Sequence, residues 1–116
     1  MIIINKRKGV IFMSETSLET RFHQDIVKAC NRMKKEAGCN PTHFMKNLSS
    51  LGGLQAAKLM IAKNSDAETF SKLWENKKLS LSIEAFVIKS DYRELFTEEE
   101  VRICVQRLRD YGYLQS

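Results

Sequence analysis

The chain has 116 residues, of which 43% are hydrophobic and 28% are charged, and its formal net charge is +5. This length and composition suit one soluble domain with a single core and exclude wholesale disorder. Five glycines and one proline are too few for the many turns of a β-sandwich. Three cysteines without a dense pattern favour reduced thiols and a cytoplasmic location. No apolar run approaches the ~20 residues of a membrane-spanning helix, so no membrane association is expected.

The first 13 residues have two interpretations. The segment carries three consecutive basic residues, Lys6, Arg7 and Lys8. Apolar residues 2–4 and 10–12 on either side predict a small β arm. Their order, apolar before basic, is wrong for a secretory signal. The alternative is that translation begins at Met13, which leaves 14–116 as the helical domain and lowers the formal charge by three, from +5 to +2.

From residue 14 onward the hydrophobic pattern is helical. Thr16 and Glu19 form a predicted capping box, and Gly38 is a natural helix end. Between them, apolar residues recur at steps of three and four and form one stripe: Leu18, Phe22, Ile26, Ala29, Cys30 and Met33. This spacing predicts a first helix with one buried face.

Two further helices are expected in the middle of the chain. Asn40 suits an N-cap and Pro41 the first helical position, where a missing N–H costs nothing. Gly52 and Gly53 end this helix and release a third one over residues 54–63. The pair is typical of a helical hairpin. Its second helix offers few polar side chains early on, so sequence-specific DNA recognition is not expected.

The last third of the chain repeats the same signals. Residues 65–68 form a second predicted capping box before a short helix. Residues 79–88 begin with strand-like alternation, but a lone strand has no partner, so we expect a helix from Ser80 or Ser82. A single turn follows at 92–96. The sequence therefore favours one all-α domain, a compact bundle of five to seven short helices.

The last helix is the most clearly delimited. Thr97 and Glu100 form a third predicted capping box, with an acidic first turn that suits the helix dipole. Apolar residues follow at helical spacing, and Gly112 marks the end.

Four blocks of the sequence together resemble one family. They are Gly52-Gly53-Leu54-Gln55-Ala56-Ala57-Lys58, Phe70-Ser71-Lys72-Leu73-Trp74, Leu95-Phe96-Thr97-Glu98-Glu99-Glu100 and Tyr111-Gly112-Tyr113. The chain resembles, over about residues 28–114, an uncharacterised bacterial family of small helical modules. The resemblance implies a bacterial, cytoplasmic protein that occurs as a module, and it implies no catalytic residue. The first 12 residues lie outside it.

Catalytic and metal-binding patterns are weak. Four soft ligands lie within 21 positions: His23, Cys30, Cys39 and His43. They could form a tetrahedral zinc site, but the usual close Cys pair is absent and Cys30 lies on the apolar stripe. Cys39 and His43 could form a thiolate pair, yet no third orienting group is evident. We therefore expect no metal, no cofactor and no enzyme, and keep a small zinc protein or thiol enzyme as a weak alternative.

Positive charge is concentrated in one part of the chain. Residues 21–63 hold eight basic and two acidic residues, a net +6, whereas residues 64–116 hold eight basic and ten acidic ones, a net −2. Lys28, Arg32 and Lys35 fall at i, i+4 and i+7, so they predict a basic ridge on the first helix. Other basic residues could extend this surface: Lys46, Lys58, Lys6, Arg7 and Lys8. Such a surface could bind nucleic acid non-specifically, or be a solvated face.

Two aromatic residues are candidate anchors for a protein partner. Trp74 lies on a short helix and Tyr113 follows the last helix, and Trp and Tyr are enriched at interface hot spots. The leading hypothesis is a protein-interaction or adaptor module. The alternative is an accessory protein that binds nucleic acid through its basic surface.

Overall fold

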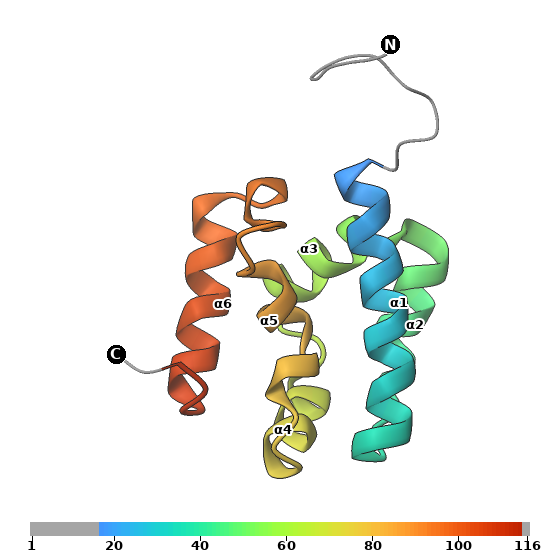
Figure 1. The fold of residues 1–116 in the computed structure, drawn as a ribbon, viewed down its shortest axis with the longest axis vertical. Coiled ribbons are helices and arrows are strands. Elements are labelled where there is room, and N and C mark those ends of the chain that lie inside the picture. Colours follow the sequence, from blue (N-terminus) through green and yellow to red (C-terminus); the bar gives the residue numbers. More distant parts are fainter. Residues whose placement is uncertain (1–16, 115–116) are drawn as a thin grey trace.

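The computed structural model describes residues 17–114, drawn in colour in Figure 1. Within these residues it contains six α-helices and two short 3₁₀ turns, and no strand. In chain order the elements are α1 (Leu18–Ala37), α2 (Thr42–Leu51), α3 (Gly53–Lys63), α4 (Ala67–Glu75), η1 (Leu79–Leu81), α5 (Ile83–Val87), η2 (Arg93–Leu95) and α6 (Glu98–Asp110). The predicted all-α bundle of five to seven helices is confirmed. The predicted β arm lies outside the described residues.

The third helix occupies the middle of the bundle. α3 packs against α1, α2 and α6, while α5 packs against α6. Figure 1 shows α1 and α6 on opposite sides of the molecule, with α3 and α5 between them and α4 at one end. The turn η1 contacts α1, α4 and α5 and so ties that end of the bundle together.

The core is built from the apolar stripes that the sequence predicts. All of the first stripe except Leu18 is buried, and Phe22 is fully enclosed. Its ring meets Tyr92 and Phe96 edge to face, with centroids 5.2 and 5.4 Å apart, a favoured aromatic geometry. Large side chains from the other elements complete the interior: Phe44, Ile61, Leu73, Leu81, Val87 and Leu108.

Several predicted helix ends are confirmed. The Thr97 side chain accepts from the Glu100 N–H at 3.0 Å, and the Glu100 carboxylate accepts from the Thr97 N–H at 2.9 Å, completing a capping box. Gly38 ends α1 at φ +59°, a backbone conformation that glycine adopts without strain. The helix expected from Ser80 or Ser82 is α5, where the Ser82 hydroxyl accepts from the Ala85 N–H at 3.1 Å.

Three predicted helix starts were wrong in detail. α1 is capped by Ser17, whose hydroxyl accepts from the Thr20 N–H at 3.1 Å. α2 is preceded by Pro41, not Asn40, and Pro41 at ψ 63° is not helical. The capping box predicted over residues 65–68, with Ser65 as its N-cap, is not formed: Asp66 precedes α4, and its side chain makes no capping bond and lines a small cavity. Local sequence placed each helix correctly and missed its first residue.

No helix within residues 17–114 has both the length and the apolar content needed to cross a membrane.

The contact between α1 and α3 depends on a glycine. The Gly53 N–H donates to His23 Nδ1 at 2.8 Å, which satisfies one of the free amides at the start of α3. A Cβ atom at Gly53 would lie 2.8 Å from the His23 Cα atom, closer than real side chains approach. Because the obstruction is backbone, a rotamer change in His23 cannot relieve it.

We therefore expect Gly53→Ala to destabilise the fold. The added methyl group must push α1 and α3 apart and weaken the hydrogen bond to His23, a cost of about 1–3 kcal/mol in the free energy of unfolding. Urea denaturation followed by circular dichroism measures this loss. Gly38→Ala is the control, since nothing lies within 4 Å of that position and only backbone strain of about 1 kcal/mol applies. A Gly53→Ala protein as stable as wild type contradicts the close-packing argument.

Candidate functional site

Aromatic side chains from α4 and from the end of α6 meet at one end of the bundle. The Tyr111 ring lies edge to face with Phe70 at 4.8 Å and with Trp74 at 5.6 Å. The Tyr111 hydroxyl lies 3.3 Å from the Ser71 hydroxyl, within hydrogen-bond distance. Phe70 is buried and packs against Tyr111 from the core, whereas Trp74 is 49% exposed.

Both predicted partner anchors line one open hollow beside these rings. Trp74 and Tyr113 are 39 positions apart in the sequence, and Tyr113 is 42% exposed. We call this feature the aromatic hollow and define it by its lining residues: Trp74, Lys77, Leu79, Ser80, Tyr111, Gly112 and Tyr113. Its lining combines large exposed rings with a buried leucine, which is the chemistry of an interface anchor pocket.

Two helix ends of the same type frame the aromatic hollow. At the end of α6, the Gly112 N–H donates to Arg109 O and the Tyr113 N–H donates to Leu108 O, both at 2.9 Å. This is a Schellman motif, with Gly112 at φ +78° in the left-handed position. The motif turns the chain sharply and brings Tyr113 to the hollow.

The end of α4 has the same hydrogen-bond pattern with a different residue at the turn. The Lys77 N–H donates to Trp74 O at 3.0 Å and the Lys78 N–H donates to Leu73 O at 2.8 Å. Lys77 takes the left-handed position at φ +59°, where glycine or asparagine is usual. Sequence analysis missed Lys77, because a helix end without glycine gives no local signal of this conformation.

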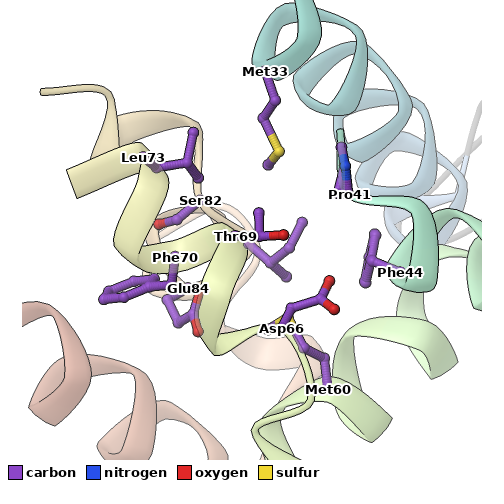
Figure 2. A pocket seen from close by; sticks show the side chains of 11 residues that line it. Met33, Pro41, Phe44, Met60, Asp66, Thr69, Phe70, Leu73, Ser82 and Glu84 are labelled. Carbon is purple, nitrogen blue, oxygen red and sulfur yellow. The ribbon is translucent and has the colours of Figure 1, made fainter. Parts of the chain in front are cut away.

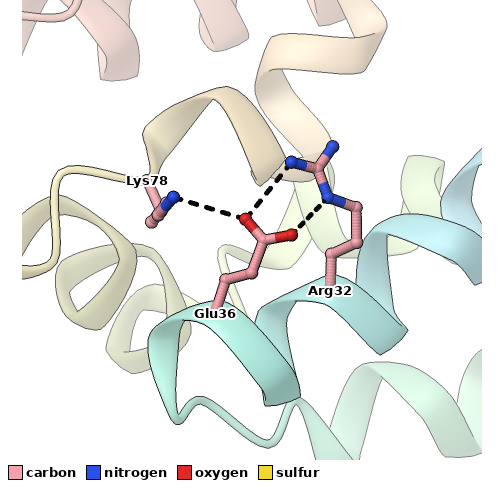
Figure 3. A network of polar contacts seen from close by, with 3 residues as sticks. All are labelled: Arg32, Glu36 and Lys78. Carbon is pink, nitrogen blue, oxygen red and sulfur yellow. Dashed lines mark hydrogen bonds and ion pairs between the residues drawn. The ribbon is translucent and has the colours of Figure 1, made fainter.

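The predicted basic ridge is exposed on α1, but one member is paired. Lys28, Arg32 and Lys35 are all exposed. The Arg32 Nε atom lies 2.7 Å from a Glu36 oxygen, and Lys78 reaches the same carboxylate at 3.3 Å (Figure 3). The hydrogen bond from Arg32 lowers the pKa of the Glu36 carboxyl. Within residues 17–114, no carboxylate lies within 4.0 Å of Lys28 or Lys35.

The remaining predicted basic residues do not join one surface. Lys46 is exposed on α2. Lys58 is partly buried, lies 2.7 Å from a Glu100 oxygen and sits over the Phe96 ring. Lys58 therefore links α3 to α6 and is not a free surface charge. The other three predicted members, Lys6, Arg7 and Lys8, lie outside the described residues.

The four soft ligands do not form one site. Cys30 and Cys39 are both buried in the core. His23 Nδ1 is occupied by the Gly53 N–H, and His43 is exposed. Burial raises the pKa of the Cys30 thiol to about 11 and also raises that of Cys39, which keeps both protonated at neutral pH. In the described part of the chain, no three His, Cys, Asp or Glu side chains gather as a metal ion would require.

A small internal cavity contains polar groups. Its volume is about 10 Å³, enough for about one water molecule. Figure 2 shows four polar side chains among apolar ones around it, Asp66, Thr69, Ser82 and Glu84. Burial raises the pKa of the Asp66 carboxyl. A space of this size cannot hold a substrate.

Glu84 is the buried charged group of this region. It is only 4% exposed, and burial raises the pKa of its carboxyl, while the nearby Arg107 guanidinium lowers it. The Arg107 Nη1 atom lies 3.4 Å from the Glu84 carboxylate, and Nη2 donates to Ile61 O at 2.8 Å. Arg107 thus holds α6 against both α5 and α3.

Comparison of the chain with protein-family models, with curated proteins and with solved structures gave no match to any of them. The resemblance to a bacterial family of helical modules therefore stays a prediction.

Removing the partner of Glu84 should destabilise the protein in a pH-dependent way. Arg107→Met leaves a buried carboxylate without a cation, at a cost of about 3–5 kcal/mol at pH 7. The pKa of Glu84 in the fold is raised above its unfolded value. The contribution of the Glu84 carboxyl to the free energy of unfolding is therefore present below its unfolded pKa and is lost as the pH rises through its folded pKa. The loss caused by Arg107→Met should shrink toward pH 4, where Glu84 protonates.

Urea denaturation at pH 4 and pH 7 measures this effect. The double variant Glu84→Gln/Arg107→Met is the control, because it has no buried charge to strand and should regain stability at pH 7. A loss that is equal at both pH values would show that Arg107 acts through packing alone.

Proposed function

We propose that this chain is a non-catalytic protein-interaction module, in a bacterial cytoplasm, that docks a partner on the aromatic hollow. One observation carries the proposal: Trp74 and Tyr113, each an anchor candidate on sequence grounds, line the same open hollow, and Trp74 is 49% exposed. The half-exposed Trp74 indole packs at 5.6 Å against the Tyr111 ring in an edge-to-face arrangement and leaves much of its apolar surface available to a partner.

The apolar area that a partner could cover at Trp74 and Tyr113 supports docking on the aromatic hollow. A tryptophan presents roughly 250 Å² when fully accessible, so covering its exposed half removes on the order of 100 Å² of apolar surface. At about 25 cal/mol per Å², this contributes roughly 2–3 kcal/mol to association. Covering Tyr113 adds a further contribution, because its ring also has few rotatable bonds to immobilise. Two such anchors are enough to form a hot spot.

Substitution of the anchors tests the proposal. Random dodecapeptides displayed on phage are selected on the full chain, and the affinities of enriched peptides are then measured by fluorescence anisotropy. We expect Trp74→Ala to weaken binding about 30- to 100-fold, as the loss of about 2–3 kcal/mol requires, and Tyr113→Ala to weaken it less. Thermal unfolding of each variant checks that the fold is retained.

Leu51→Ala is the matched control. Leu51 is 47% exposed and lies on α2, outside the aromatic hollow. Its truncation removes a similar apolar side chain and should leave peptide affinity unchanged. Enriched peptides that bind Trp74→Ala and wild type equally would place the interaction surface elsewhere.

A second candidate function is non-specific nucleic-acid binding through α1. The observation that favours it is the exposure of Lys28 and Lys35 without a carboxylate within 4.0 Å among the described residues. Free ammonium groups on one helix face can neutralise phosphates and release counterions. Arg32 lies between them, but its charge is largely compensated by Glu36, so the ridge is less basic than its sequence predicts.

This pairing predicts an order of effects among matched substitutions. If α1 binds nucleic acid, Lys28→Ala and Lys35→Ala should each weaken duplex DNA binding more than Arg32→Ala does. Replacing a lysine that contacts a phosphate should make the slope of log K against log salt less steep by ~0.9. Titrations of labelled duplex DNA at several salt concentrations measure both quantities. Absence of binding at low salt eliminates this candidate.

A further inference from the structure

The charge of the aromatic hollow is of one sign. Among its seven lining residues, Lys77 is the single charged one. Two acidic residues, Glu75 and Asp110, adjoin lining residues in the sequence, and neither is part of the lining. In the described part of the chain, no carboxylate lies within 4.0 Å of the Lys77 ammonium. The neighbouring Lys78, by contrast, is paired with Glu36.

Other side chains of the lining can also donate a hydrogen bond to an acceptor. The Trp74 indole N–H can only donate, whereas the Ser80 and Tyr113 hydroxyls can donate or accept. Leu79 is buried at the hollow and supplies an apolar surface. A ligand that complements this lining has a bulky apolar group next to a negatively charged acceptor.

The backbone at Lys77 is in a conformation that is less favourable for lysine than for glycine. Lys77 and Gly112 occupy the same position of two Schellman motifs that face one hollow. Glycine adopts this left-handed conformation freely, whereas lysine is strained there. Lysine at this position is less stable than glycine would be, and it adds to the lining of the hollow an ammonium that has no carboxylate within 4.0 Å among residues 17–114.

We propose that the aromatic hollow binds a short acidic peptide segment. A large apolar or aromatic side chain of the segment packs against Trp74 and Tyr113, and an adjacent Asp or Glu carboxylate pairs with the Lys77 ammonium. This inference rests on the proposed docking function of the hollow and adds the chemical class of the partner. It uses a direct charge pair for orientation and the rings for affinity, the usual division between rim and anchor.

Trp74 makes the location of binding directly observable. It is the single tryptophan of the sequence, so a change in tryptophan emission on adding a peptide that lacks tryptophan reports the aromatic hollow. Dodecapeptides enriched on the full chain are expected to carry a large apolar residue with Asp or Glu within two positions. Synthetic copies of them should change the Trp74 emission on titration.

Charge exchange tests the partner class. Lys77→Glu should weaken an acidic peptide about 2- to 10-fold, because it removes an exposed ion pair and adds repulsion of similar size. The same peptide with Lys in place of Asp or Glu should prefer Lys77→Glu over wild type. Lys72→Glu is the matched control. It makes the same charge change on an exposed α4 residue outside the hollow, and it should have a smaller effect on both peptides.

Lys77→Gly separates charge from folding. It keeps the left-handed backbone and relieves its strain, so the midpoint of thermal unfolding should rise while the affinity for acidic peptides falls. Enriched peptides that depend on Trp74 but are neutral or basic, or that bind Lys77→Glu as well as wild type, overturn the acidic partner and leave docking at the hollow intact. A selection in which no peptide depends on Trp74 overturns both.

Discussion

Close packing of α3 against three neighbours is the constraint on which the rest of the structure depends. Gly53, Ala56 and Ala57 are all buried on this helix, and small side chains let helix backbones approach. α1, α2 and α6 can therefore all contact α3. At Gly53 the approach leaves no room for a Cβ atom, so the register between α1 and α3 is fixed by sterics and by the hydrogen bond to His23. The positions of α1 and α6, and of everything they carry, follow from this central helix.

Ion pairs between elements complete the positioning and remove charges from the surface. Lys58 joins α3 to α6 through Glu100, and Arg107 joins α6 to Glu84 on α5. Burial raises the pKa of the Glu100 carboxyl, but hydrogen bonds from Lys58 and from the Thr97 N–H outweigh it, and the net shift is downward. One carboxylate thus caps α6 and anchors α3. Because these cations serve the fold, the net charge of a sequence segment overstates the charge available to a partner.

The sequence predicted what local chemistry determines. Thr97 and Glu100 meet within one helical turn, so their capping box could be recognised from spacing alone, and it is present. The apolar stripe of α1 was also predicted, since a period of three to four residues fixes one face of a helix. Local spacing predicted a capping box over residues 65–68 that is not formed. Asp66 precedes α4 and lines a small cavity, and the lining of that cavity comes from several helices, which local spacing does not describe.

The candidate site shows the same limit. Trp74 and Tyr113 were recognised as anchors by residue type, but only the folded chain places them on one hollow with Tyr111 between α4 and the last turn. Lys77 could not be recognised for two reasons. No glycine marks its left-handed backbone at the end of α4, and it lines the same hollow as Gly112, which is 35 positions away. The predicted basic ridge included Arg32 as a free charge, but Arg32 pairs with Glu36. The two are four residues apart, a spacing that favours pairing on a helix.

The aromatic hollow combines residues held by the core with exposed side chains, and the proposed docking depends on this arrangement. Tyr111 is held by the buried Phe70 ring and by the Ser71 hydroxyl, and Leu79 belongs to the core. Both helix ends are closed by backbone hydrogen bonds. If a partner docks here as proposed, it meets a Tyr111 ring whose position is already set, which reduces the conformational entropy lost on association. Core residues hold the base of the hollow, and the two helix ends provide its exposed side chains. At Lys77, the exposed side chain is present together with a strained backbone.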